Sequence, residues 1–224
     1  EAVGYLEKVA SENAGTIYLC GHSKGGNLAT YAASMAKPET RARIAEIVTF
    51  DSPGFDDGTL QSAGYREILP RIRSFVPQTS IVGMLMGVPE QYTVVKSDAF
   101  AAFQHNTFTW KLDGPHFETL PSVDNTSRVI KAALDEFLRS STPEMRGILV
   151  DTLFEILSAP NARTINDMKA NWTGTAAAIW NATRSIDPST RKVVMSIVGS
   201  LASEGLESAK RLAPELEKKK PKEE

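Results

Sequence analysis

Three residue types in this chain have the surroundings that nucleophilic catalysis requires: a serine, a histidine and an aspartate. The serine, Ser23, lies in the segment Gly21-His22-Ser23-Lys24-Gly25, between an apolar stretch and an alanine-rich one. A G-x-S-x-G pattern between a strand and a helix predicts a nucleophile elbow, a sharp turn that lifts the serine hydroxyl above the end of a sheet. Gly21 and Gly25, two residues to either side, are expected to lack bulk so that the chain can pass.

The same turn predicts where negative charge on a reaction intermediate would be stabilised. The backbone N–H of Lys24 is expected at the N-terminus of a helix, where it can donate to an oxyanion. The alternative is a phosphate-binding or merely tight glycine-rich turn, but the Lys24-Gly25-Gly26 run does not have the spacing of a P-loop. The pattern therefore favours a serine hydrolase.

A serine nucleophile needs a base, and the chain has three histidines. His22 precedes Ser23, and alternation along a strand points its side chain away from the serine, so we expect it to pack beside the turn. His105 lies in a loop after the fourth predicted strand, where the order serine, acid, histidine of an α/β-hydrolase places the base. For His116 a solvated loop histidine is favoured over a catalytic role.

The acid that would orient the histidine is marked less clearly. The loop after the third predicted strand, residues 76–81, contains no carboxylate. Asp51 is the best candidate, because it follows the second predicted strand and so lies at the same sheet edge as Ser23. An aspartate that bonds the turn backbone before Ser52 and Pro53 is an equally good interpretation of Asp51. Three other aspartates compete for the role: Asp98, Asp56 and Asp57.

Short apolar segments alternate with helical patterns over the first half of the chain. The patterns predict helices over residues 2–13, 26–36 and 59–69, strands over 16–20, 44–50, 71–76, 91–96 and 107–112, and helices from about residue 123 onward. This alternation predicts an α/β fold with a parallel sheet and right-handed crossovers. Beyond residue 140, apolar residues at helical spacing predict packing faces, with Trp172 and Trp180 anchoring them rather than capping an acyl-binding groove.

The composition bounds the function further. With 25 basic and 27 acidic residues the net charge is −2, which gives no reason to expect a nucleic-acid partner. The single cysteine, Cys20, allows no disulfide within the chain and is expected to be a buried structural thiol, which suits a cytoplasmic protein without excluding secretion. The longest apolar run, residues 81–88, is too short for a membrane span. No cofactor and no metal are predicted.

Four segments resemble, in the same order, the Mbeg-like family, a lipase-like and largely uncharacterised bacterial group: residues 21–29, 50–55, 76–84 and 104–110. The similarity runs from the N-terminus to about residue 160. It implies a fold like that of the class-3 lipases in the α/β-hydrolase superfamily, with Ser23 as nucleophile and His105 as base. It leaves the acid open, because the segment similar to the lipase aspartate loop, Arg73 to Pro77, has no carboxylate.

We expect three regions: residues 1–140 as the carboxyl-terminal part of an α/β-hydrolase domain, 141–213 as a helical extension and 214–224 as a disordered charged tail. Such a domain normally has several strands, and a loop that supplies a second oxyanion N–H, before its nucleophile. Here Ser23 follows one predicted helix and one strand. An upstream segment of the same protein is therefore expected to complete the sheet.

Two classes of function follow from these observations. The first is a serine ester hydrolase, lipase-like or thioesterase-like, that forms an acyl-enzyme on Ser23 from a small-molecule ester or lipid-like substrate. The second is a non-catalytic protein that keeps the fold while its helical tail binds a partner or, through the tail lysines, a membrane surface. The second is motivated by the acid missing after the third strand and by the missing oxyanion loop.

Overall fold

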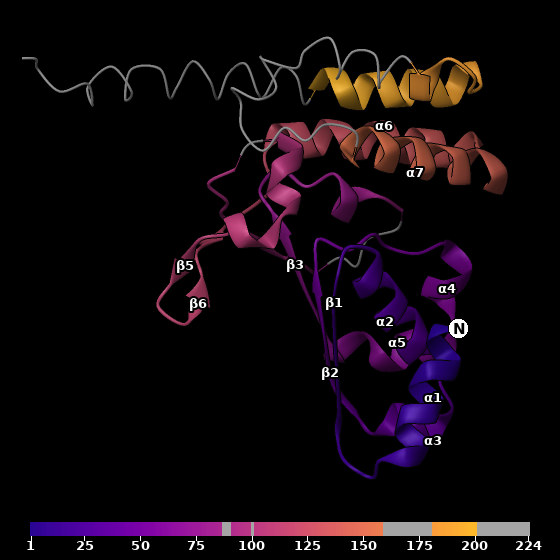
Figure 1. Ribbon diagram of the computed structural model, residues 1–224, viewed down its shortest axis with the longest axis vertical. Coiled ribbons are helices and arrows are strands. Elements are labelled where there is room, and N and C mark those ends of the chain that lie inside the picture. The colour runs from indigo at the N-terminus through magenta and orange to yellow at the C-terminus, as the bar shows by residue number, and fades with distance from the viewer. Residues whose placement is uncertain (87–90, 100, 159–180, 201–224) are drawn as a thin grey trace, which may run out of the picture. The chain divides into compact units, whose positions relative to one another are not determined.

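The computed structural model describes residues 1–86, 91–99, 101–158 and 181–200 (Figure 1). It divides into two compact units, one formed by Glu1–Ala99 with Gln104–Ser127, the other by Phe100–Phe103 with Arg128–Glu224. The boundary predicted near residue 140 stays a prediction. Trp172, Trp180 and the tail over 214–224 lie outside the described residues.

A five-stranded sheet with the order β1-β2-β3-β4-β7 forms the centre of the first unit. Its first four strands are parallel, and the fifth is antiparallel to β4. They are β1 (Ile17–His22), β2 (Ile44–Phe50), β3 (Ile72–Pro77), β4 (Thr93–Val95) and β7 (Thr119–Leu120). The predicted α/β fold with a mostly parallel sheet is thus confirmed. Within the described residues β1 pairs with β2 alone and forms one edge of the sheet.

The helices of this unit lie on one face of the sheet (Figure 1). They are α1 (Ala2–Glu12), α2 (Lys24–Met35), α3 (Pro38–Ala42), α4 (Asp57–Gln61) and α5 (Ala63–Ile68). Because β1, β2 and β3 follow one another in space as in sequence, right-handed crossovers between them place every connecting helix on the same side. The core is packed between this layer and the sheet, from Leu6, Ala32, Ala33, Ala36, Ile44, Ile47 and Ile68.

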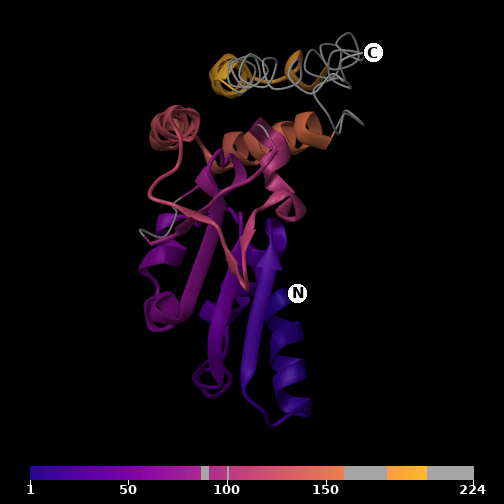
Figure 2. The ribbon, with the colours of Figure 1, turned by 90° about the vertical axis from the view of Figure 1, so that its left-hand side faces the viewer.

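None of these five helices lies on the opposite face of the sheet, onto which Figure 2 looks. Side chains of β1 that alternate toward this face are exposed, including Tyr18 and Cys20. The prediction of a buried Cys20 is therefore wrong, because the crossovers cover only the other face. Near the carboxyl ends of the strands an aromatic cluster covers part of the open face, made of Phe50, Phe75, Trp110 and Phe117.

Several element boundaries differ from the prediction, each for a local reason. The helix predicted over 59–69 is broken at Ser62, whose side chain accepts a hydrogen bond from the backbone N–H of Tyr65 and so starts a second helix. The strand predicted over 107–112 is largely a 3₁₀ turn, Thr107–Thr109, capped by the side chain of Asn106. Trp110 forms an isolated bridge with Ser97, and β5 (Leu112–Asp113) pairs with β6 (His116–Phe117) in a hairpin.

The second unit is helical where it is described. Helix α6 (Asn125–Ser140) begins in the first unit and continues into the second, and α7 (Pro143–Ser158) follows it. Residues 188–200 are also helical. In the described part of the chain no helix combines the length and the apolar character that a membrane crossing needs.

The turn between β1 and α2 is tight enough to require glycine. Ser23 has φ 56° and ψ −131°, a conformation that L-residues rarely adopt. A Cβ at Gly21 would lie 2.4 Å from the backbone of Gly25, and a Cβ at Gly26 would lie 2.8 Å from the carbonyl oxygen of Gly21. A Cβ at Gly25 would meet nothing within 4 Å. The turn thus requires glycine at positions 21 and 26, whereas position 25, which the motif also suggested, has room for a side chain.

We predict opposite effects for alanine at the two glycines of the motif. Gly21→Ala forces backbone against backbone and should lower the free energy of unfolding by about 1–3 kcal/mol. Gly25→Ala adds a methyl group in open space within a helix and should change it by less than about 1 kcal/mol, in the stabilising direction. Urea unfolding of both variants measures the difference. Equal losses would contradict the close packing of Gly21.

Candidate functional site

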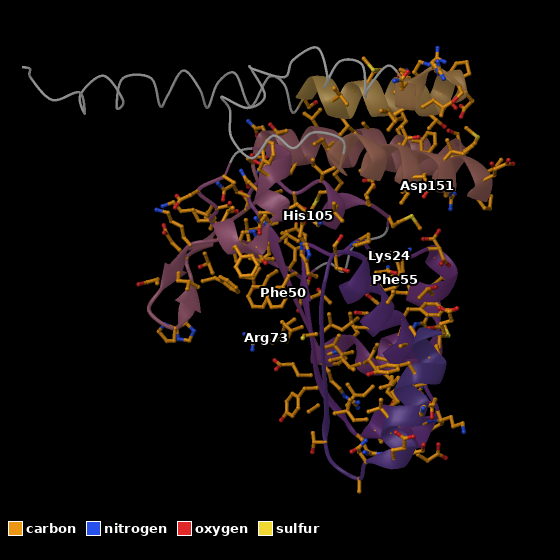
Figure 3. All side chains as sticks on the ribbon, viewed as in Figure 1. Lys24, Phe50, Phe55, Arg73, His105 and Asp151 are labelled. Atoms are coloured by element: carbon orange, nitrogen blue, oxygen red, sulfur yellow. The ribbon has the colours of Figure 1, made fainter. Side chains whose placement is uncertain are left out.

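Ser23 and Lys24 lie where β1 ends and α2 begins. The backbone N–H of Ser23 donates to the carbonyl oxygen of Phe50 over 2.9 Å, which fixes the turn to the neighbouring strand β2. Lys24 is the first residue of α2, and the first N–H groups of a helix have no acceptor within the helix. An oxyanion beside Ser23 could therefore accept a hydrogen bond from the backbone N–H of Lys24. Figure 3 labels the side chains of Lys24 and His105.

Asp51 follows β2 directly and contacts His105. The distance from Asp51 Oδ2 to His105 Nδ1 is 2.7 Å. A carboxylate only accepts hydrogen bonds, so His105 Nδ1 carries a proton and donates it in a hydrogen bond to Asp51. In the neutral ring Nε2 is then the nitrogen that accepts a hydrogen bond. Asp51 is 1% exposed and has φ 43°, and its backbone N–H donates to the carbonyl oxygen of Phe75 in β3. The structure thus brings the predicted acid and the predicted base together.

The other carboxylate oxygen of Asp51 is held by the loop after β3. Oδ1 accepts a hydrogen bond from Ser80 Oγ at 2.5 Å and one from the backbone N–H of Gly83 at 3.0 Å. A Cβ at Gly83 would lie 2.6 Å from Asp51 Oδ1, so only glycine brings its N–H this close. Both oxygens of the buried carboxylate are satisfied, as a buried charge requires.

The segment that carries His105, the 3₁₀ turn η3 (Ala101–His105), is anchored through the residue before the histidine. Gln104 is 2% exposed, and its side chain exchanges two hydrogen bonds with Thr79, from Thr79 N to Oε1 and from Nε2 to Thr79 Oγ1. Trp110 Nε1 donates to the carbonyl oxygen of Gln104 at 2.8 Å. These contacts fix the backbone from which the imidazole of His105 projects.

His22 is partly exposed to solvent, and one side of its ring contacts His105. The distance from His22 Nε2 to the carbonyl oxygen of His105 is 2.8 Å, and the two ring centroids are 4.4 Å apart with an angle of 37° between the planes. Burial lowers the pKa of His22, and the neighbouring His105 lowers it further. The expectation that His22 packs beside the turn agrees with this placement.

No hydrogen bond joins Ser23 Oγ to a ring nitrogen of His105 among the described residues. Both residues lie at the carboxyl ends of the strands. His22 and Phe50 are partners in the register of β1 and β2, so Ser23 and Asp51 follow neighbouring strands, and Asp51 holds His105. Catalytic hydrogen bonds of free enzymes are commonly long and tighten when substrate binds. The structure thus places Ser23 and the Asp51–His105 pair at the ends of neighbouring strands, without a hydrogen bond between Ser23 Oγ and His105.

The competing candidates lie in other surroundings. Asp98 pairs with Lys111 at 3.1 Å and its side chain is 69% exposed. Asp56 caps α4 through the backbone N–H of Thr59, and that hydrogen bond lowers its pKa. Asp57 is exposed in the first turn of the same helix, and His116 is exposed in the hairpin. None of the four makes a hydrogen bond with His105 in the described part of the chain.

Sequence reasoning missed three groups that hold the pair: Ser80, Gly83 and Gln104. All three lie in segments that carried the family resemblance, 76–84 and 104–110, but had been given no role. The signal was therefore present as a motif. Nothing in the periodicity of the chain could assign it to Asp51, because a loop brings these groups to the site.

The comparison with family models matches residues 1–155 to the Mbeg1-like family. The chain belongs to this family. The matched part contains every residue of the site: Ser23, Lys24, Asp51, Ser80 and His105. A search of the curated proteins found no match.

Removal of the Ser80 hydroxyl should measure how much its hydrogen bond to the buried carboxylate of Asp51 stabilises the fold. Ser80→Ala leaves Asp51 Oδ1 with a single donor and should lower the free energy of unfolding by about 1.5–3 kcal/mol, the range for hydrogen bonds to charged groups. Ser34→Ala is the matched control, because Ser34 is equally buried but donates only to a carbonyl of its own helix, at Tyr31. Urea unfolding at pH 7 measures both, and equal losses would contradict the assigned role of Ser80.

The lowered pKa of His22 predicts a loss of stability in acid. An unfolded histidine titrates near 6.5, so between that pH and the lower pKa of the folded state the unfolded chain binds more protons. Stability should therefore fall as the pH drops through about 6.5. In His22→Phe this component is absent, so its unfolding free energy should change less between pH 7.5 and 5 than that of the wild type. Parallel profiles would contradict the prediction.

Proposed function

We propose that the protein is a serine hydrolase that cleaves carboxylic esters or thioesters through an acyl-enzyme on Ser23. In this proposal the turn at Ser23 is a nucleophile elbow of an α/β-hydrolase fold. Asp51, Ser23 and His105 form the catalytic triad, and the backbone N–H of Lys24 is one donor of the oxyanion hole.

Each of these residues has one role in the proposed reaction. Ser23 Oγ attacks the acyl carbonyl carbon while His105 Nε2 takes its proton. Asp51 keeps the other nitrogen, Nδ1, protonated and stabilises the imidazolium that forms. The N–H of Lys24 donates to the carbonyl oxygen as it becomes negative. His105 then returns the proton to the leaving alkoxide or thiolate, and a water activated in the same way hydrolyses the acyl-enzyme.

The bond between Asp51 and His105 is the observation that carries the proposal. A histidine held at Nδ1 by a buried aspartate occurs here beside a serine in a strained turn at the end of the adjacent strand. Strained residues of this kind concentrate at functional sites. Membership of the Mbeg1-like family is consistent with a lipase-like protein that acts on esters.

The alternative is a non-catalytic interaction protein with the same fold. Two observations favour it: Ser23 Oγ makes no hydrogen bond to a histidine in the described structure, and part of one sheet face is exposed, with Tyr18 at 71%. Exposed apolar surface of this kind often marks a binding site. Reactivity of Ser23 distinguishes the two functions.

A fluorophosphonate probe should label the wild-type protein at one site, Ser23, as shown by intact mass and peptide mapping. Ser23→Ala should abolish labelling, and His105→Ala and Asp51→Asn should slow it by about 10²- to 10⁴-fold, because a general base contributes that much. The double variant of His105→Ala and Asp51→Asn should be labelled no more slowly than the slower of the two single variants, since members of one unit fail together.

His116→Ala and Asp98→Asn are the controls, because both residues are exposed and make no contact with the site. They should label at the rate of the wild type. Full labelling of His105→Ala would refute the mechanism, and a wild type that resists labelling would favour the interaction protein.

A further inference from the structure

His22 makes two contacts with the proposed base, and they act on different parts of it. Its Nε2 lies 2.8 Å from the backbone carbonyl oxygen of His105, and its ring lies against the His105 ring with centroids 4.4 Å apart. A carbonyl oxygen only accepts, so His22 Nε2 carries the proton and donates. One contact thus holds the backbone of His105 and the other holds a face of its imidazole.

The sequence position of His22 makes this contact a link between nucleophile and base. His22 is the last residue of β1 and the next residue is Ser23, whereas His105 is 83 residues away in η3. Asp51 restrains the imidazole only at Nδ1. A ring held at one nitrogen can still tilt about that bond, and a tilt moves Nε2, the atom that must face Ser23.

We propose that His22 is a positioning residue that holds the imidazole of His105 in register with Ser23, an inference that rests on the proposed hydrolase function. It does not exchange a proton with substrate. Its donor nitrogen is occupied by a carbonyl oxygen, and its ring supplies the flat surface that stops the tilt of His105. A strand residue next to the nucleophile thereby sets the orientation of the base.

The charge state of His22 agrees with this role. The ionisable groups that face it are His105 and Asp51. Burial lowers the pKa of His22 most and the neighbouring His105 ring lowers it further, whereas the hydrogen bond to the His105 carbonyl oxygen and the charge of Asp51 raise it by smaller amounts. A neutral ring at pH 7 does not oppose the imidazolium that His105 becomes during the reaction.

Three substitutions separate the two contacts. His22→Phe keeps a ring against His105 but removes the donor, His22→Gln keeps a donor but removes the ring, and His22→Ala removes both. His116→Phe is the matched control, because His116 is an exposed histidine in the hairpin β5–β6. All four are first compared with the wild type by thermal unfolding, and only folded variants are scored.

The first measurement does not depend on activity. Proton NMR follows the low-field signal of the His105 Nδ1 proton that bonds Asp51, assigned by its loss in Asp51→Asn. The wild type and His116→Phe should show a sharp signal, and His22→Ala should show one broadened by faster exchange with water. An unchanged signal in all three His22 variants would overturn the inference.

The second measurement is the rate of fluorophosphonate labelling at Ser23. His22→Ala should lower the maximal rate by about 10- to 100-fold with little change in half-saturation, because a misplacement of about 1 Å costs that much in rate. His22→Phe and His22→Gln should each recover part of the loss. If His22→Ala broadens the NMR signal but the wild type is not labelled, the hydrolase function is refuted and the positioning of His105 remains supported. If His22→Ala is labelled at the wild-type rate, the inference is overturned.

Discussion

A carboxylate that is 1% exposed requires its charge to be compensated, since desolvation of an ion costs several kcal/mol even after relaxation. Asp51 meets this requirement with donors from two segments distant in sequence: Ser80 and Gly83 from the loop after β3, and His105 from η3. The demand of one buried charge therefore fixes two loops against the end of β2. Once Asp51 is satisfied, the protonated nitrogen of His105 is fixed as well, and Nε2 is left to accept a proton.

The positions of Ser23 and Asp51 have a different origin, namely strand register. His22 and Phe50, the last residues of β1 and β2, are register partners, so Ser23 and Asp51 follow the ends of neighbouring strands at the same level. Adjacent strands are only about 4.8 Å apart. The backbone thus brings Ser23 and Asp51 close together, whereas His105, the proposed base, is held there by side-chain contacts from η3. The same sequential strand order places all connecting helices on one face and leaves the other to the aromatic cluster.

The difference between strand register and loop contacts explains which parts of the site could be predicted from the sequence. The apolar pattern predicted β2 to the residue, because burial patterns record local structure, and the G-x-S-x-G motif placed the turn between β1 and α2 at Ser23. Asp51 could be chosen over Asp98 only from topology, since both follow strands. The contacts of Ser80, Gly83 and His22 could not be predicted, because neither loop conformation nor the coverage of a sheet face has a period. The exposed Cys20 is the clearest case: its strand was predicted, but not which face the crossovers would cover.

Backbone strain connects these two origins. Ser23 and Asp51 both have positive φ, a conformation that costs on the order of 1–3 kcal/mol for each residue. Each is held by a backbone N–H that continues the ladder beyond its strand, from Ser23 to Phe50 and from Asp51 to Phe75. Because the acceptor for Ser23 is the residue that precedes Asp51, relaxation of the strained backbone at Asp51 would rotate the carbonyl that holds Ser23. Ser23 and Asp51 therefore cannot relax independently, and the buried charge that fixes Asp51 also keeps Ser23 in its strained conformation.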